Sequence, residues 1–421
     1  MEEWKEYKLG DVCTIFGRIG FRGYTTDDLT NDPNQGAISL SPTNIVQGEI
    51  DLSKPTFIKW DKYYESPEIM VYTNDIVLVK TGSSIGRTAI IRELKHPITL
   101  NPQLVVLKDI KINSYYLSYL IKSYLFQAQL KSITVGSAIP TLSQKNLANL
   151  KICVPDLTLQ NKIASILKSL DDKIENNRKI NENLEQQAQA LFKSWFVDFE
   201  PFRDQPFVES ELGMIPEGWR VYSLPELVNV YSGYSYKGSE LKESKNAMAT
   251  IKNFDRSGGF KVDGYKEIEL SDRIKTTQYA NLFDVIVAHT DLTQNAEIIG
   301  NPVLILNKNG YDKIIISMDL CKVVPKTSFI SNTLLYCILN DSRFKQHALG
   351  YVNGTTVLHL NKKALPDYKI ALPCDLSYLY TITKAIDPLF RAESNNIIES
   401  SRLSQLRDTL LPKLMSGEIK L

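Results

Sequence analysis

The segment Lys80–Arg87 combines the residue types that contact DNA. It holds two basic residues, three hydroxyl residues and two glycines on a predicted strand-to-strand connection. Small residues let the backbone approach a ligand, hydroxyls and amides can bond phosphate, and arginine can bind guanine through two hydrogen bonds. Polar glycine-rich turns are common, however, and this one is not a Gly-x-x-x-x-Gly-Lys-Ser/Thr loop. The candidate contacts here are Lys80, Thr81, Ser83, Ser84 and Arg87.

Other polar segments add candidates in both halves of the chain. His289–Asn295 carries two side-chain amides suited to adenine. Gly20–Gly23 and Tyr234–Gly238 place aromatics beside bases, although an aromatic packed under a turn explains them equally well. A further pair of loops lies at Gly136–Thr141 and Gly354–His359. The resulting candidates are Arg22, Ser137, Thr141, Lys237, His289, Thr290, Thr293, Gln294, Asn295, Thr355 and His359, with Asn44, Asn253 and Arg256 as weaker ones.

Motifs for catalysis are missing from the sequence. It has no Asn/Asp-Pro-Pro-aromatic tetrapeptide, Gly-x-Gly turn, Walker loop, His-Glu-x-x-His or Gly-x-Ser-x-Gly. Asp75 with Glu93 and Lys95 loosely fits an Asp…Glu-x-Lys nuclease pattern, but Asp284, its counterpart in the second half, has no Glu-x-Lys, which favours a coincidence of surface charge. The five cysteines form no Cys-x-x-Cys pair and the four histidines have no metal-ligand spacing. We therefore expect buried free thiols and no catalytic, cofactor-binding or metal-binding residues.

Length and composition are those of an ordinary globular protein. The 421 residues, 43% hydrophobic and 23% charged, suggest two or three domains. No apolar run approaches the roughly 18 residues of a membrane span, and the charged N-terminus has no signal-peptide core. We expect a soluble, cytoplasmic protein without membrane contact. The net charge of +1 neither supports nor excludes nucleic acid, because binding needs only a local basic face.

A long internal repeat organises the chain. Three blocks match at shifts of 215, 209 and 218 positions: residues 4–23 with 219–238, residues 74–81 with 283–290, and residues 136–155 with 354–373. The residues between the blocks diverge. The sequence therefore predicts two copies of one mixed α/β (α+β) scaffold, whose divergent loops bind different things. Helices are expected at Ser114–Lys131 and Asn332–Leu349.

Each copy is followed by a long predicted helix, at 158–196 and 376–415, related by a shift of 219. Both are nearly free of glycine and follow a heptad pattern with a polar centre. At 1.5 Å per residue, such a helix is roughly 50 Å long. An antiparallel coiled-coil spacer is favoured over independent solvated helices, and would place the modules at opposite ends about a pseudo-twofold axis. The predicted seam consists of Ile163, Leu167, Leu170, Ile174, Asn177, Leu184, Leu191, Ile382, Ile386, Leu389, Asn396, Leu403 and Leu410.

Five segments resemble the specificity subunits of type I restriction–modification systems. The string at Leu191–Phe202 is similar to the junction after the first helix in that family, and Gly213–Trp219 to the start of its second module. Gln160–Ala164 and Leu170–Ile174 resemble the opening of the first helix, and Leu411–Ile419 resembles the C-terminal motif. The order of motifs agrees along the whole chain. The second copy lacks the Ser-Trp-Phe-Val-Asp-Phe string of the first.

The resemblance implies four regions: target recognition domain 1 (1–156), spacer helix 1 (157–200), target recognition domain 2 (201–374) and spacer helix 2 (375–421). It implies a non-catalytic subunit in which each recognition domain reads one half of a bipartite, asymmetric site in double-stranded DNA. The helices would dock two methyltransferase subunits, and two restriction/translocase subunits would complete the complex. S-adenosylmethionine, ATP and Mg2+ would belong to those partners, with no cofactor in this chain.

Three other functions remain open from the sequence. The chain could be a nuclease or methyltransferase acting alone, which turnover without partners would reveal. It could be a duplicated protein–protein scaffold that does not bind DNA. It could also be the specificity subunit of a type IIB/IIG-like system. The basic, glycine-rich loops favour the DNA-reading interpretation.

Overall fold

The computed structural model describes residues 4–421 except 47, 135–139, 257 and 294. The chain forms two compact units. Unit 1 combines Met1–Asp172 with Leu403–Leu421, and unit 2 is the continuous stretch Lys173–Arg402. Each unit thus contains one copy of the repeat together with part of both long helices. The four predicted regions differ from these units because they treat each long helix as a region of its own, whereas both units divide the helices.

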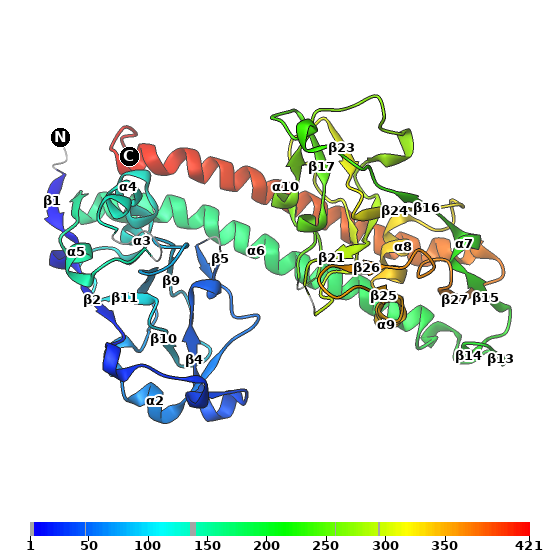
Figure 1. Ribbon diagram of the computed structural model, residues 1–421, viewed down its shortest axis with the longest axis horizontal. Coiled ribbons are helices and arrows are strands. Elements are labelled where there is room, and N and C mark those ends of the chain that lie inside the picture. Colours follow the sequence, from blue (N-terminus) through cyan, green and yellow to red (C-terminus); the bar gives the residue numbers. More distant parts are fainter. Residues whose placement is uncertain (1–3, 47, 135–139, 257, 294) are drawn as a thin grey trace. The chain divides into compact units, whose positions relative to one another are not determined.

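The described residues of unit 1 form two four-stranded sheets, two strand pairs and five short α-helices (Figure 1). The antiparallel sheet has the order β2 (Thr14–Gly17), β11 (Leu104–Lys108), β8 (Ile76–Val79), β9 (Thr88–Ile90). The mixed sheet has the order β10 (Ile98–Leu100), β4 (Gly36–Leu40), β7 (Phe57–Lys59), β3 (Leu29–Thr30). The remaining elements are the pairs β1 (Lys5–Lys8) with β12 (Lys151–Val154) and β5 (Ile45–Val46) with β6 (Glu49–Ile50), and α1 (Leu9–Val12), α2 (Trp60–Tyr64), α3 (Ser114–Lys122), α4 (Tyr124–Ser132) and α5 (Gln144–Ala148).

Unit 2 repeats this plan (Figure 1). Its antiparallel sheet is β16 (Val228–Ser232), β24 (Leu320–Pro325), β20 (Val285–Ala288), β22 (Pro302–Leu304). Its mixed sheet is β18 (Lys266–Glu267), β17 (Asn246–Ala249), β23 (Lys313–Ile316), β19 (Tyr279–Ala280). The other elements are β13 (Phe207–Ser210) with β14 (Gly213–Pro216), β15 (Trp219–Ser223) with β27 (Lys369–Pro373), β21 (Thr290–Asp291) with β26 (Leu358–Leu360) and β25 (Val352–Asn353), and the helices α7 (Leu224–Leu227), α8 (Asn332–Leu339) and α9 (Ser342–Leu349).

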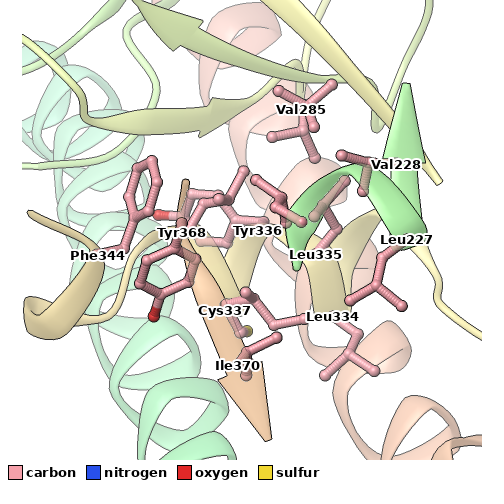
Figure 2. Packing of buried hydrophobic residues seen from close by; sticks show 14 of the residues in the cluster. Leu227, Val228, Val285, Leu334, Leu335, Tyr336, Cys337, Phe344, Tyr368 and Ile370 are labelled. Atoms are coloured by element: carbon pink, nitrogen blue, oxygen red, sulfur yellow. The ribbon is translucent and has the colours of Figure 1, made fainter. Parts of the chain in front are cut away.

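The two central strands show why these runs form buried sheets. Every residue of β8 and of β20 is buried. In β8, Ile76 and Leu78 pack into the cluster on the helix side, whereas Val77 and Val79 pack into the cluster shared with the mixed sheet. Successive side chains of a strand point to opposite faces, so a strand covered on both sides must be apolar throughout. Figure 2 shows the corresponding helix-side core of unit 2, with Val285 above the buried residues of α8.

The expected helices at Ser114–Lys131 and Asn332–Leu349 are each divided in two. Ser123 ends α3 and caps α4, because its hydroxyl accepts a hydrogen bond from the Phe126 amide. Asp341 caps α9 in the same way, its carboxylate accepting from the Arg343 amide at 2.9 Å. Short polar side chains compete with helix continuation by bonding the backbone of the next turn, so the predicted uninterrupted helices were wrong.

The two long helices are α6 (Leu157–Phe196) and α10 (Leu379–Met415), which pack together antiparallel within each unit (Figure 1). In unit 2, Asn177 donates to the side chains of Glu399 at 2.7 Å and Ser400 at 3.2 Å, and Asn396 donates to Asn181 at 2.8 Å. Partner numbers fall on α10 as they rise on α6, which defines the antiparallel direction.

The predicted seam residues are buried near the start of each long helix and at Asn177. The predicted seam residues Ile163, Leu167, Asn177, Ile382 and Ile386 are buried. The other seam positions are half-buried: Leu170, Ile174, Leu184, Leu191, Leu389, Asn396, Leu403 and Leu410.

Within the described residues, no helix is long and apolar enough to cross a membrane. All five cysteines are free, but only Cys13, Cys321 and Cys337 are buried. Cys153 and Cys374 are exposed, so the expectation of buried thiols was wrong for these two. Cys153 lies on the outward-facing side of β12, where burial alternates along the strand.

Candidate nucleic-acid interface

Two predicted loops of unit 1 meet immediately after β8. Thr81 forms an antiparallel β-bridge with Thr141, the Leu142 amide donates to the Lys80 carbonyl at 2.8 Å, and the Gly82 amide donates to the Pro140 carbonyl at 3.0 Å. We call this junction the loop crossing of unit 1. The crossing continues the β8 strand beyond the edge of the sheet, and it brings together two candidate segments that lie far apart in sequence.

The candidates at this crossing differ in exposure. Ser83, Arg87 and Thr141 are exposed, and Lys80, Thr81 and Ser84 are half-buried. Burial lowers the pKa of the Lys80 ammonium group. Ser137 lies outside the described residues.

Unit 2 contains the same crossing at the repeat-equivalent positions. Thr290 pairs with His359, and the Leu360 amide donates to the His289 carbonyl at 2.9 Å. His359 and Thr355 are exposed. Burial, together with the charge of Lys362, lowers the pKa of His289, whose Nε2 is buried and has no hydrogen-bond partner among the described residues. The second crossing therefore presents imidazoles where the first presents Lys80 and Thr141.

Asp291, which the sequence analysis did not single out, holds the loop after β21 in shape. Its carboxylate accepts from the amides of Thr293 at 2.7 Å and Ile298 at 2.7 Å. Burial would raise the pKa of Asp291, but these hydrogen bonds outweigh it and leave the pKa below its ordinary value. The Thr293 hydroxyl also donates to Asp291, at 2.8 Å. Lys345 stabilises the C-terminal part of the same loop by donating to the carbonyls of Ala296 and Ile299.

Two predicted contacts of this loop, Thr290 and Thr293, are therefore engaged within the protein. Thr290 is only 8% exposed, so its side chain faces the protein. The Thr293 hydroxyl is engaged within the loop, whereas Asn295 is exposed. Gln294 lies outside the described residues.

The aromatic and basic turns have protein partners. Arg22 lies 3.4 Å from a Glu68 carboxylate oxygen. Lys237 is exposed, and its backbone amide donates to the Glu240 carboxylate at 2.7 Å. Arg256, a weaker candidate, is exposed and lies 3.6 Å from Glu297.

Asn44 and Asn253 are structural. Each is buried at a repeat-equivalent position. Asn44 accepts from the Ser41 amide at 2.9 Å and donates to the Asp51 carbonyl at 3.0 Å. Asn253 accepts from the Thr250 amide at 2.9 Å and donates to the Lys261 carbonyl at 2.8 Å. Their amides are used to brace a turn and are not offered to a ligand.

The aspartates of the loose nuclease pattern also belong to the scaffold. Asp75 lies 3.8 Å from Lys108 and accepts from the Tyr72 amide at 2.8 Å. Asp284 lies 3.6 Å from Lys322 and accepts from the Asn281 amide at 2.9 Å. Both aspartates are paired with a lysine of the neighbouring strand, so they form an ion pair that the two copies share, whereas Glu93 and Lys95 of the loose pattern are exposed.

Sequence reasoning missed two residues at the crossings, Gln144 and Lys362. They occupy equivalent positions, 218 residues apart, just after the crossing in each copy. In unit 1, a methyl group added at Gly17 would lie 2.5 Å from the Gln144 side-chain nitrogen and 3.4 Å from the Lys80 ammonium nitrogen. Both positions lie inside the aligned block of residues 136–155 and 354–373, but their residue types differ between the copies and so did not stand out.

Comparison with known proteins identifies relatives of the whole chain. Residues 1–186 match the family model described as the type I restriction modification DNA specificity domain. The type I restriction enzyme MjaIX specificity subunit of Methanocaldococcus jannaschii is 31% identical, over 100% of this chain and 94% of its own length. The HindI specificity subunit of Haemophilus influenzae is 25% identical over 100% of both chains.

A solved structure shares the fold. The S subunit of a type I restriction–modification system from M. genitalium superposes with a TM-score of 0.56 at 16% sequence identity, covering 98% of this chain and 96% of that one. The mixed α+β modules and the packed long helices are therefore features that both chains have.

Proposed function

Because this chain belongs to the specificity subunits of type I restriction enzymes, we propose that its two modules each read one half of a bipartite, asymmetric DNA site. The repeated loop crossing is the observation that carries this proposal. One backbone framework presents Lys80–Arg87 in unit 1 and His289–Asn295 in unit 2. Equal scaffolds with unlike reading loops suit a target with two unlike halves.

The long helices would serve as the spacer between the modules and as the docking surface for two methyltransferase subunits. Two restriction/translocase subunits would complete the complex. The methyltransferase subunits would supply S-adenosylmethionine and the restriction subunits ATP and Mg2+. The adenine to be methylated must leave the base stack, so the modules position the duplex for base flipping by the partner. Each module alone binds weakly, and the spacer makes the second engagement intramolecular.

An exchange of modules tests this function. Residues 1–155 would be replaced by the equivalent residues of the MjaIX specificity subunit, and the hybrid co-expressed with its methyltransferase subunit. Single-molecule sequencing of the host DNA should then report a methylated site with one altered half and one unaltered half. A change in both halves would contradict modular reading. Methylation or cleavage by the purified chain without partners would contradict a non-catalytic role.

A further inference from the structure

Two side chains at the loop crossing of unit 1 point hydrogen-bond donors at one place without an acceptor. The Lys80 ammonium group and the Gln144 amide nitrogen both lie over the backbone of Gly17, where an added methyl group would be 3.4 Å and 2.5 Å from them. Gly17 ends β2, and Gln144 begins α5. Within the described part of the chain, neither side chain makes a hydrogen bond or ion pair.

An unpaired, half-buried cation is unfavourable in the free protein. Burial lowers the pKa of Lys80, and no carboxylate offsets that cost among the described residues. Donors that are partly removed from water and left without acceptors lose free energy until a ligand supplies the acceptor. The arrangement is therefore suited to binding an anion.

Unit 2 has an equivalent pair of donors, although the residue types differ. His289 replaces Lys80, and Lys362 replaces Gln144. Lys362 lies two residues after Leu360, whose amide donates to the His289 carbonyl at 2.9 Å, and the buried Nε2 of His289 has no partner in the described residues. Each crossing thus combines one lysine with one neutral nitrogen-bearing side chain.

The ligand follows from what the two copies share. The reading loops of the copies have diverged, whereas the same two positions together supply one lysine and one further nitrogen-bearing side chain in both, with the lysine at Lys80 in unit 1 and at Lys362 in unit 2. A group present in both halves of an asymmetric DNA site is the backbone phosphate, and phosphate contacts position a protein without reading sequence. We infer that each loop crossing binds one DNA phosphate, through Lys80 and Gln144 in unit 1 and through His289 and Lys362 in unit 2. This inference rests on the proposed function.

The test uses the full chain in complex with its co-expressed methyltransferase subunit and a duplex that carries the site found by methylation mapping. Phosphates are replaced one at a time by neutral methylphosphonates. The unaltered complex should lose affinity at one phosphate facing each crossing. Lys80→Met should weaken binding about 10-fold, lower the salt slope by about 0.9 and abolish sensitivity at the first of these phosphates only. Lys362→Met should do the same at the second.

Two further variants separate the site from general effects. Gly17→Ala inserts a methyl group 2.5 Å from the flexible end of Gln144 and 3.1 Å from the buried Val105 side chain, and should reproduce the Lys80→Met phosphate profile; its melting temperature is measured alongside to account for repacking of Val105. Lys95→Met removes an exposed charge elsewhere in unit 1 and should leave the phosphate profile unchanged.

Other results would overturn the inference. Undiminished sensitivity of Lys80→Met at every phosphate would exclude a phosphate contact. A loss that depends on one base pair, detected with 7-deazaguanine in its place, would make Lys80 a base-reading residue. Failure of the unaltered complex to bind the mapped duplex would instead contradict the proposed function itself.

Discussion

Arg87 lies exposed on the turn between β8 and β9, and its guanidinium makes no hydrogen bond or ion pair within the described residues. Gly86, with φ of +87°, lets the chain turn immediately before it. An unengaged arginine on a reading loop can bind guanine with a pair of hydrogen bonds, which discriminates against the wrong base by about 1–3 kcal/mol.

Arg87→Ala should therefore relax or weaken the reading of one half-site by about 10-fold or more, leaving the other half unchanged. Methylation mapping of cells that carry the variant measures this directly. Arg203→Ala, which removes an exposed arginine paired with Glu200, is the control and should leave both halves as they were. Equal loss at both halves would contradict the assignment of Arg87 to one module.

Glu393 is a buried carboxyl group on α10 that keeps a proton at neutral pH. Burial, with the charge of Glu185 as a second cause, raises the pKa of Glu393 to about 8. Its Oε2 has no partner among the described residues, while Glu185 accepts a hydrogen bond from Tyr336. A folded pKa above the unfolded one gives stability that is complete below the unfolded pKa and is lost as the pH rises through about 8.

Glu393→Gln should accordingly raise the free energy of unfolding of unit 2 by about 2–4 kcal/mol near pH 8, and by less than about 1 kcal/mol near pH 5. Hydrogen exchange of α8 and α10 at the two pH values measures the change. Glu243→Gln, at an exposed position of the same unit, should have no such effect. A stabilisation that did not depend on pH would show that Glu393 is not protonated in the folded chain.

At this scale the sequence predicted residue types better than their environments. The exposure of Ser83, Arg87 and Thr141 agrees with the prediction of surface loops. The burial of Thr290 depends on pairing with His359, which is distant in sequence, and Asn253 is buried because the turn folds around its side chain. Residue type alone cannot distinguish an amide that braces a turn from one that is free to bind a base.

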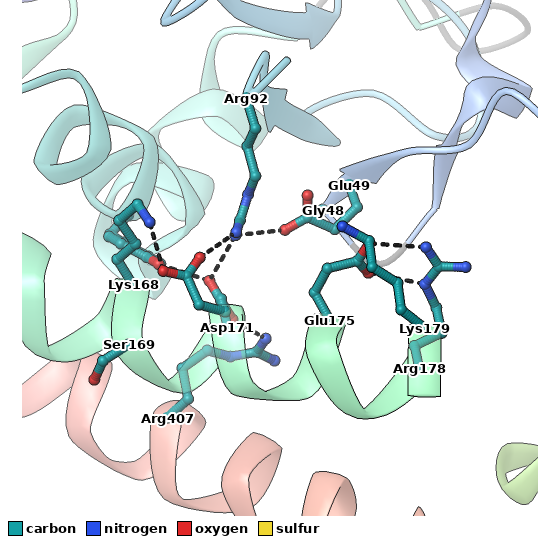
Figure 3. A network of polar contacts seen from close by, with 12 residues as sticks. Gly48, Glu49, Arg92, Lys168, Ser169, Asp171, Glu175, Arg178, Lys179 and Arg407 are labelled. Atoms are coloured by element: carbon teal, nitrogen blue, oxygen red, sulfur yellow. Dashed lines mark hydrogen bonds and ion pairs between the residues drawn. The ribbon is translucent and has the colours of Figure 1, made fainter. Parts of the chain in front are cut away.

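Among the secondary-structure elements, α6 is attached to the module of unit 1 by charged groups (Figure 3). Asp171, 7% exposed, accepts from Arg407 of α10 at 2.8 Å and from the Tyr119 hydroxyl of α3 at 2.6 Å. Arg92 lies 2.9 Å from Glu49 and 2.6 Å from Asp172. This network links α6 and α10 to α3 and to Glu49 of β6.

The repeat-equivalent positions of unit 2 are apolar. Phe390 stands in place of Asp171, Ala188 in place of Arg407 and Cys337 in place of Tyr119, and all three belong to the buried core of unit 2. Heptad spacing predicted the course of both helices, but it could not predict that these three positions carry an ionic network in unit 1 and apolar side chains in unit 2. That difference arises from the facing module, which the spacing does not describe.

Asp171→Asn should destabilise the local packing of unit 1 by about 3 kcal/mol, because it removes the buried charge that Arg407 and Tyr119 bond and leaves Arg407 with only the exposed Asp408 as a charged partner. Hydrogen exchange in α3 should become about 100-fold faster, with no change in α8. Glu182→Gln, which removes one carboxylate of an exposed pair with Arg178, should cost less than about 1 kcal/mol. Unchanged exchange in α3 would show that the network does not hold this attachment together.

For the whole molecule, the internal repeat predicted the duplicated scaffold. The bridge of Thr81 with Thr141 and the pair of Thr290 with His359 lie at corresponding positions, as the shifts of 209 and 218 require. What the repeat could not predict is that unit 1 is built from both ends of the chain. Leu414 and Met415 are buried in the core of unit 1, although more than 200 residues separate them from the other buried members of that core.

Leu414→Ala should lower the stability of unit 1 by about 2–5 kcal/mol, since it leaves a cavity in that core. Faster hydrogen exchange should appear in β8 and β11, while the strands of unit 2 keep their protection. Leu406→Ala, at a position of α10 that is 47% exposed, should change neither unit by more than about 0.5 kcal/mol. Loss of protection in both units together would contradict their independence as packing units.

The divided course of unit 1 also has a consequence during synthesis. A methyl group added at Gly417 would lie 3.2 Å from the indole nitrogen of Trp4, so the residues after α10 contact the residue that precedes β1. Unit 2 is synthesised as the continuous stretch 173–402. Unit 1 begins earlier but cannot complete its packing until residues 403–421 have been made. The half that is translated second is thus the first able to complete its fold, which reverses the usual N-terminal-first order.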